Sequence, residues 1–168
     1  NCETLAFEPS VYNLDVFMEN ILYNNLSKNI SIVPFWIIEN NGVIDINYKE
    51  RLSGSADLEI SINQLRNNNT LSYGLSLDSF QNLYNLKYPK YIKIDVDGSE
   101  LSILNGANRI IDNVKEILIE VDQNNNSKHL IENYFVNKNF KKKIEETIRL
   151  NASNINAPIN QIWVRNEN

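Results

Sequence analysis

Acidic residues follow three apolar runs of this sequence, at points where each run would leave a β-sheet. They are Glu8 after the first run, Asp95 and Asp97 after a central run, and Glu120 and Asp122 after a later one. A carboxylate at a strand end can accept hydrogen bonds from a sugar diol, orient a cation or take a proton from a hydroxyl group. Each acid could also simply cap the following helix, but three such groups at one sheet edge favour a functional site.

Strands and helices alternate along the chain, as judged from the spacing of apolar residues. Strands are predicted over residues 4–8, 30–38, 43–48, 71–77, 91–96 and 116–121, with a closing antiparallel pair at 141–150 and 161–165. Helices are predicted over residues 10–25, 78–86 and 127–138, and another follows the turn at Gly98 and carries Leu101, Leu104 and Ala107. This order predicts an α/β sheet with helices on both faces, and ligands in such sheets bind beyond the carboxyl ends of the strands.

Local signals make the prediction more specific. Asn40-Asn41-Gly42 is a hairpin signal that would pair residues 43–48 with residues 30–38. Pro9 suits the first turn of a helix, and Asp78 suits a helix N-cap. Residues 49–70 are polar and predict an irregular surface excursion, and the many asparagines are expected mostly in turns.

Composition limits the class of protein. With 168 residues, no repeat and no linker, the chain predicts a single domain over 1–168. The net charge of −5 argues against nucleic acid and anionic membranes as partners. The lone Cys2 favours a reducing cytoplasm, and we find neither a signal peptide nor an apolar run of about 18 residues that could span a membrane.

The longest motif of the sequence resembles a segment of a known protein family. The block Ile92-Lys93-Ile94-Asp95-Val96-Asp97-Gly98-Ser99-Glu100-Leu101 resembles the most recognisable segment of the FkbM-type methyltransferases. Phe7-Glu8-Pro9 with Asn24-Asn25-Leu26, the segment Leu77-Asp78-Ser79-Phe80 and the strand Ile117-Leu118-Ile119-Glu120-Val121 resemble further parts of that family in the same order. The similarity covers roughly residues 4–165 and is most specific in the central block.

The resemblance implies a Rossmann-like class I methyltransferase fold with S-adenosylmethionine as methyl donor. It also implies a small-molecule or glycan acceptor, often a hydroxyl group on a sugar or natural product. By position, Glu8 with Pro9 would bind the cofactor ribose, and Asp95 would lie near the reacting methyl group. We hypothesise that Asp95 or Asp97 acts as general base and that Glu120 orients the acceptor. The acceptor pocket would come from loops at 49–70 and 122–128, and no metal-ligand pattern is evident.

One part of the family pattern is missing. The family normally begins with a strand and a glycine-rich loop that approaches the methionine part of the cofactor. None of the five glycines, at 42, 54, 74, 98 and 106, has the required spacing. The sequence therefore predicts a domain that is incomplete at its N-terminus, either part of a longer product or a remnant.

Two other classes of function stay open. The chain could be a truncated, non-catalytic Rossmann-like binding module. Ile94-Asp95-Val96-Asp97-Gly98-Ser99 also resembles the nucleophile loop of haloacid-dehalogenase-like phosphatases, although no paired-aspartate loop follows it. An EF-hand is excluded because Gly98 follows Asp95 too closely. The single histidine, His129, is expected on a helix surface, and Trp36, Tyr73 and Trp163 are expected to pack in the core or on strands rather than to stack on an acceptor.

Overall fold

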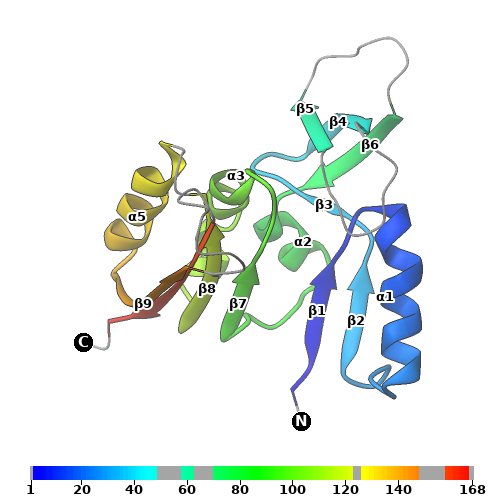
Figure 1. The fold of residues 1–168 in the computed structure, drawn as a ribbon, viewed down its shortest axis with the longest axis horizontal. Helices are drawn as coiled ribbons and strands as arrows, with labels where there is room; N and C mark the ends of the chain where they lie inside the picture. Colours follow the sequence, from blue (N-terminus) through cyan, green and yellow to red (C-terminus); the bar gives the residue numbers. More distant parts are fainter. Residues whose placement is uncertain (1, 49–57, 63–69, 123–125, 148–157, 167–168) are drawn as a thin grey trace. The chain divides into compact units, whose positions relative to one another are not determined.

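The computed structural model describes residues 2–48, 58–62, 70–122, 126–147 and 158–166 (Figure 1). Its contacts divide the chain into two compact units, Asn1–Leu75 and Ser76–Asn168. The prediction of one continuous domain stays a prediction.

The first unit begins with a β-α-β arrangement. Strands β1 (Thr4–Phe7) and β2 (Ile30–Val33) are parallel, and helix α1 (Val11–Tyr23) connects them. A crossover helix is expected here because parallel neighbours cannot be joined by a tight hairpin. The helix begins after the N-cap Ser10, so the prediction that Pro9 lies in the first helical turn is wrong by two residues. Among the described residues, β1 pairs with β2 only.

Asparagine ends helix α1 by a specific mechanism. Asn25 has a φ of 56°, in the left-handed region that asparagine tolerates better than most residues. Its N–H donates to the Leu22 carbonyl and that of Leu26 donates to the Ile21 carbonyl, which is the Schellman pattern. Asn85 and Asn139, with φ of 49° and 60°, follow two further helices. The expectation that asparagine serves turns is confirmed at these positions.

A second sheet of the first unit has the order β3-β6-β4-β5. Its members are β3 (Trp36–Ile37), β4 (Gly42–Tyr48), β5 (Leu58–Ile62) and β6 (Thr70–Leu75). The predicted hairpin is wrong, because β4 pairs with β5 and β6 and not with the strands before it. Gly42 is itself a strand residue opposite Gly74, and Pro34 separates β2 from β3.

The small core of this sheet consists of Trp36, Ile38, Ile44 and Ile46. A side chain at Gly74 would overlap that of Ile38, whose Cγ1 lies 2.8 Å from the place a Cβ would take. Strand β5 corrects the expectation of an irregular segment at 49–70. Residues 49–57 and 63–69 of that segment lie outside the described residues.

The second unit is built on one sheet with the order β7-β8-β10-β9. Strands β7 (Tyr91–Ile94) and β8 (Glu116–Val121) are parallel, and β10 (Ile159–Arg165) runs antiparallel to both β8 and β9 (Phe140–Thr147). The predicted parallel neighbours and the predicted closing antiparallel pair are therefore confirmed. Strand β7 ends at Ile94, so Asp95 and Val96 already belong to the loop that follows. Within the described residues β7 pairs only with β8.

Helices cover one face of this sheet. They are α3 (Glu100–Asn105), α4 (Asn108–Ile111) and α5 (Ser127–Asn137). Alternate residues of β8 point into the core, where Ile117, Ile119 and Val121 are fully or almost fully buried. Phe135 of α5 stacks on Trp163 of β10 with ring centroids 4.9 Å apart. This packing fixes which face of β8 presents its remaining side chains to the other side.

Helix α2 (Leu77–Leu83) corrects a predicted cap. Ser76 is the N-cap, and its hydroxyl accepts a hydrogen bond from the Ser79 N–H. Asp78 lies in the first turn instead, where its carboxylate accepts from the N–H groups of Arg109 at 2.8 Å and Ile110 at 3.0 Å. These are free donors at the start of α4, so Asp78 caps a different helix. Sequence spacing could not show this, because the two elements meet only in the fold.

Candidate functional site

The loop after β7 holds two of the predicted carboxylates in a tight turn. The Gly98 N–H lies 3.1 Å from the Val96 carbonyl oxygen, which closes a three-residue turn with Asp97 at its centre. Gly98 has a φ of 87°, a conformation that costs any residue with a Cβ about 1–2 kcal/mol. The glycine of the Asp-Val-Asp-Gly motif is thus required by the backbone itself.

Asp95 lies at the start of this loop and is bound by a lysine from its own strand. The Lys93 Nζ is 2.6 Å from Asp95 Oδ2, and the two side chains are 60% and 46% exposed. Residues two apart on a strand point to the same face, which explains the contact. The lysine partly offsets the negative charge of this edge.

Glu120 lies on the neighbouring strand and is influenced by both aspartates. Partial burial raises its pKa above the usual value, and the negative charges of Asp95 and Asp97 raise it further, while Lys93 opposes the effect. Electrostatic coupling of this kind requires proximity. The structure therefore brings together the three residues that the sequence proposed as catalytic.

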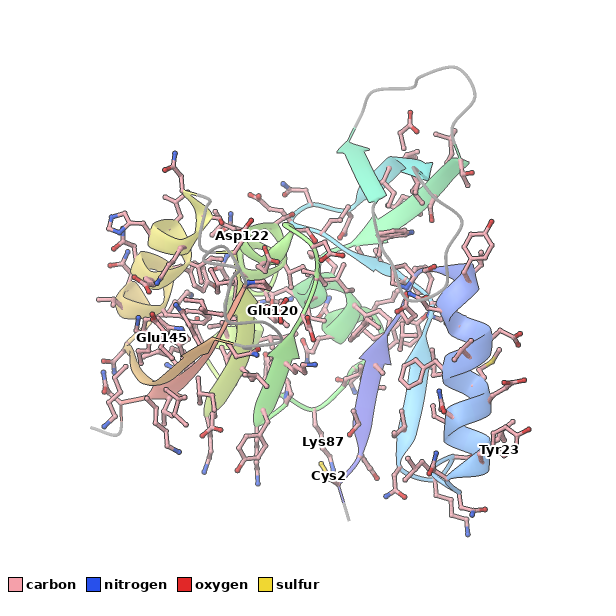
Figure 2. The ribbon with its side chains drawn as sticks, viewed as in Figure 1. Cys2, Tyr23, Lys87, Glu120, Asp122 and Glu145 are labelled. Carbon is pink, nitrogen blue, oxygen red and sulfur yellow. The ribbon has the colours of Figure 1, made fainter. Side chains whose placement is uncertain are left out.

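Glu100 adds a carboxylate that was not among the proposed site residues. It is the first residue of α3 and only 6% exposed, and its Oε1 accepts the Gly98 N–H at 3.1 Å. Burial raises the pKa of Glu100, two backbone hydrogen bonds oppose the shift, and the charges of Asp97 and Asp122 add to it. We call Asp95, Asp97, Glu100, Glu120 and Asp122 the acidic edge. Figure 2 shows Glu120 and Asp122 at the upper end of β8.

A hollow of about 320 Å³ opens on the sheet face opposite the helices. Its upper rim carries Asp95, Glu120 and Asn160, and Asn160 is placed there because it pairs with Glu120 across β8 and β10. Its remaining lining consists of Lys93 and the apolar Leu118, Ile144 and Ile162. The hollow thus combines polar groups at the carboxyl ends of β7 and β8 with an apolar floor.

Glu8 and Pro9 follow β1 in the first unit. One Glu8 carboxylate oxygen accepts the Ser10 N–H at 2.8 Å, and the other lies 3.4 Å from the Asn13 amide nitrogen. Each carboxylate oxygen can accept a second bond, so Glu8 is oriented and still able to receive two hydroxyl groups. This geometry fits the ribose diol of an adenosyl group. Pro9 links Glu8 to Ser10, the N-cap of α1.

Sequence reasoning missed Lys93, Glu100 and Asn160 as members of the site. Lys93 had a readable signal, since it alternates with Asp95 along a strand. Glu100 could have been noticed as an acid beside the required Gly98. Asn160 carried no local signal, because only the antiparallel return of β10 brings it opposite Glu120.

Several other residues have the surroundings that the sequence predicted. His129 is exposed on α5, and Trp36 and Trp163 are 8% and 3% exposed, as core residues should be. Tyr73 is 47% exposed on β6. In the described part of the chain, no group of three or more His, Cys, Asp or Glu side chains is placed to hold a metal ion. None of the described helices has the length and apolar character needed to cross a membrane.

Comparison with known families places most of the chain in one of them. Residues 2–144 match the model of the methyltransferase FkbM domain. This range includes β1, β7, β8 and every residue of the acidic edge. A comparison with curated proteins finds no match.

Comparison with solved structures gives a relative with the same fold. A methyltransferase FkbM from Methylobacillus flagellatus KT matches with a TM-score of 0.61 and 18% sequence identity over 96% of this chain. The match covers 36% of that structure, so this chain spans about a third of its length. The C-terminal domain of precorrin-6Y C5,15-methyltransferase from Rhodobacter capsulatus matches more weakly, with a TM-score of 0.46 and 12% identity over 98% of this chain and 68% of that one.

Proposed function

Because this chain belongs to the FkbM methyltransferase domain family, we propose that it takes part in methyl transfer from S-adenosylmethionine to a hydroxyl group of a sugar or other small molecule. The observation that carries the proposal is the acidic edge, where burial and the charges of Asp95 and Asp97 raise the pKa of Glu120. Such coupled carboxylates beyond the ends of parallel strands suit the binding and deprotonation of a hydroxyl group.

Glu8 is proposed to bind the ribose of the methyl donor. Its carboxylate is pre-oriented by the Ser10 N–H, so little side-chain freedom is lost when a diol binds. The donor, when bound, supplies a methyl group that is already activated on a sulfonium. The chain's own task is to hold the acceptor oxygen in line with that methyl group and to exclude water.

Glu120 is proposed to receive the acceptor's proton. A base must have a high proton affinity, and burial together with the two aspartate charges gives Glu120 a raised pKa. Asp95 is paired with the Lys93 cation and is better suited to orient the hydroxyl group. This reverses the division of roles suggested by the sequence, which gave the base to Asp95 or Asp97.

Binding of the donor is tested by calorimetric titration of this chain with S-adenosylhomocysteine. We expect binding that Glu8→Ala weakens at least tenfold, the factor for losing about 1.4 kcal/mol of hydrogen bonding. Glu3→Ala is the matched control, because Glu3 is an exposed glutamate just before the same strand. Equal affinities of the two variants would contradict the role of Glu8. A folded chain that binds nothing would instead favour a non-catalytic module.

The role of Glu120 is tested by following S-adenosylhomocysteine release with a panel of hydroxylated acceptors. Glu120→Gln should reduce kcat by about 10²-fold or more, the usual contribution of a general base. Glu116→Gln, at the opposite end of the same strand, should leave kcat near the wild-type value. Should Asp97→Asn lower kcat as strongly while Glu120→Gln does not, the base is Asp97.

A further inference from the structure

Glu100 is a buried ionisable group to which the proposed reaction gives no task. It is 6% exposed, whereas the other acids of β7 and its loop, Asp95 and Asp97, are exposed. Burying a carboxylate costs free energy unless its hydrogen bonds compensate. The contacts of Glu100 therefore indicate what the chain gains from placing it there.

The carboxylate of Glu100 is directed backwards, toward the loop before its helix. The Gly98 N–H is shared between the Val96 carbonyl oxygen and Glu100 Oε1, each 3.1 Å away. The Glu100 carboxylate is the stronger of the two acceptors, because a hydrogen bond to an ionised acceptor is about twice as strong as a neutral one. Ser99, the N-cap of α3, makes no side-chain capping bond. Glu100 thus holds the turn in a way that an ordinary cap would not.

Asp97 is the residue whose placement depends on this bond. It is the central residue of the turn between Val96 and Gly98, so the direction of its side chain follows the turn's backbone. Gly98 has room for a Cβ, with nothing within 4 Å, but its φ of 87° is one that few residues hold unaided. The turn is therefore stabilised at Gly98 in two ways: the residue tolerates the positive φ, and its N–H donates to the buried Glu100 carboxylate.

We propose that Glu100 is the positioning residue of the acidic edge: its buried carboxylate holds the Gly98 amide and thereby fixes the place of Asp97 within that edge. The consequence for catalysis rests on the proposed function. The contact between Glu100 and the loop is independent of the proposed function, and it can be measured without any methyl acceptor.

The test is NMR of the protein with Glu100→Gln and Glu100→Ala, and with Glu19→Gln and Glu19→Ala as controls on an exposed helical glutamate. In the wild type, the Gly98 amide shift should titrate with the midpoint of the Glu100 carboxyl carbon, and this titration should vanish in Glu100→Gln. Glu100→Ala should raise hydrogen exchange at Gly98 about tenfold, the factor for losing one hydrogen bond to a charged group. Neither Glu19 variant should change the titration or the hydrogen exchange of the Gly98 amide.

A merely structural role would lower thermal stability without a specific response at Gly98. Glu100→Gln keeps the size of the side chain and one acceptor oxygen. If Glu100→Ala does not fold, the test is the loss of the Gly98 amide titration in Glu100→Gln. The proposal is overturned if the Gly98 amide chemical shift of the wild type does not change as the Glu100 carboxyl group titrates. In the methyl-transfer assay, Glu100→Gln should lower kcat more than it raises KM for S-adenosylmethionine. A Gly98 response without any methyl transfer by the wild type would refute the proposed function and leave the positioning contact standing.

Discussion

Two groups of charged residues in the second unit have opposite electrostatic character. In the acidic edge, burial and neighbouring carboxylates raise the pKa values of Glu100 and Glu120. Beside β9 and α5, a second group, the lysine–glutamate network, consists of Lys128, Glu132, Lys142, Glu145 and Gln161. There, hydrogen bonds from Lys142 and Lys128 lower the pKa of Glu145 despite its partial burial. Figure 2 shows Glu145 at β9, away from Glu120.

The two groups differ in whether their charges stabilise the folded state. In the lysine–glutamate network, Lys142 donates to Glu132 at 2.8 Å and also to Glu145, and the fully buried Gln161 donates to both acids. Every member has a partner that lowers its free energy in the folded state. In the acidic edge, by contrast, carboxylates lie near one another. The Lys93 cation forms an ion pair with one of them, Asp95, beside the hollow. Like charges gathered in this way cost stability and are expected where a ligand binds.

The largest effect is expected from Gln161→Leu, which removes the buried centre of the lysine–glutamate network. The Trp163 Nε1–H loses its acceptor at 2.8 Å, and two carboxylates lose a donor. We expect a loss of about 2 kcal/mol in the free energy of unfolding, measured with urea. Asn160→Leu, one residue earlier on the opposite face, should change it by less than about 0.5 kcal/mol. Equal losses would mean that the network is not the source of stability.

Lys142→Met keeps the length of the side chain and removes its charge. Glu132 and Glu145 then face each other without the cation between them, and the cation–π contact of Lys142 with Trp163 at 5.8 Å is lost. Because these side chains are about a third exposed, solvent screening limits the expected loss to about 1 kcal/mol. The neighbouring, exposed Lys141→Met is the control in the same urea titration and should have no measurable effect.

Glu145→Gln should show a pH dependence with a defined sign. The folded-state pKa of Glu145 is lowered from its usual value near 4.5, so its ionised form stabilises the fold above that value. The stability difference between wild type and variant should be present at pH 7 and disappear as the pH falls through the lowered pKa. Unfolding measured from pH 7 to pH 3 checks this. A difference that grows toward acid pH would contradict the assignment.

Glu120→Gln should show the opposite sign and the smallest effect. The folded-state pKa of Glu120 is raised, so its penalty is absent below about pH 4.5 and grows as the pH rises through the raised value. The variant should be more stable than wild type at pH 7 by a few tenths of a kcal/mol, about the scale for a partly exposed group. A loss of stability at pH 7 would remove the contrast between the two groups of charges.

Local signals in the sequence were sufficient for the elements that carry the site. The apolar run before Asp95 and the one that includes Glu120 predicted two strands, and their parallel pairing followed from the helix between them. The hairpin at Asn40-Asn41-Gly42 was predicted from an equally good local signal and is wrong, because β6 offers both β3 and β4 a longer-range partner. Tertiary pairing overrides a turn signal when the resulting sheet buries Ile44 and Ile46.

The amino-acid sequence specifies the chemical groups available to this protein: carboxylates after the strands, a glycine that a tight turn requires, and a motif shared with FkbM methyltransferases. The way in which those groups influence one another depends on the packing of the folded chain. The burial of Glu100, the coupling of Glu120 to Asp95 and Asp97, and the arrival of Asn160 opposite Glu120 all arise between segments far apart in the chain. Desolvation and Coulomb energy depend on burial and on the distance between charges, and the local sequence predicts neither of these two quantities.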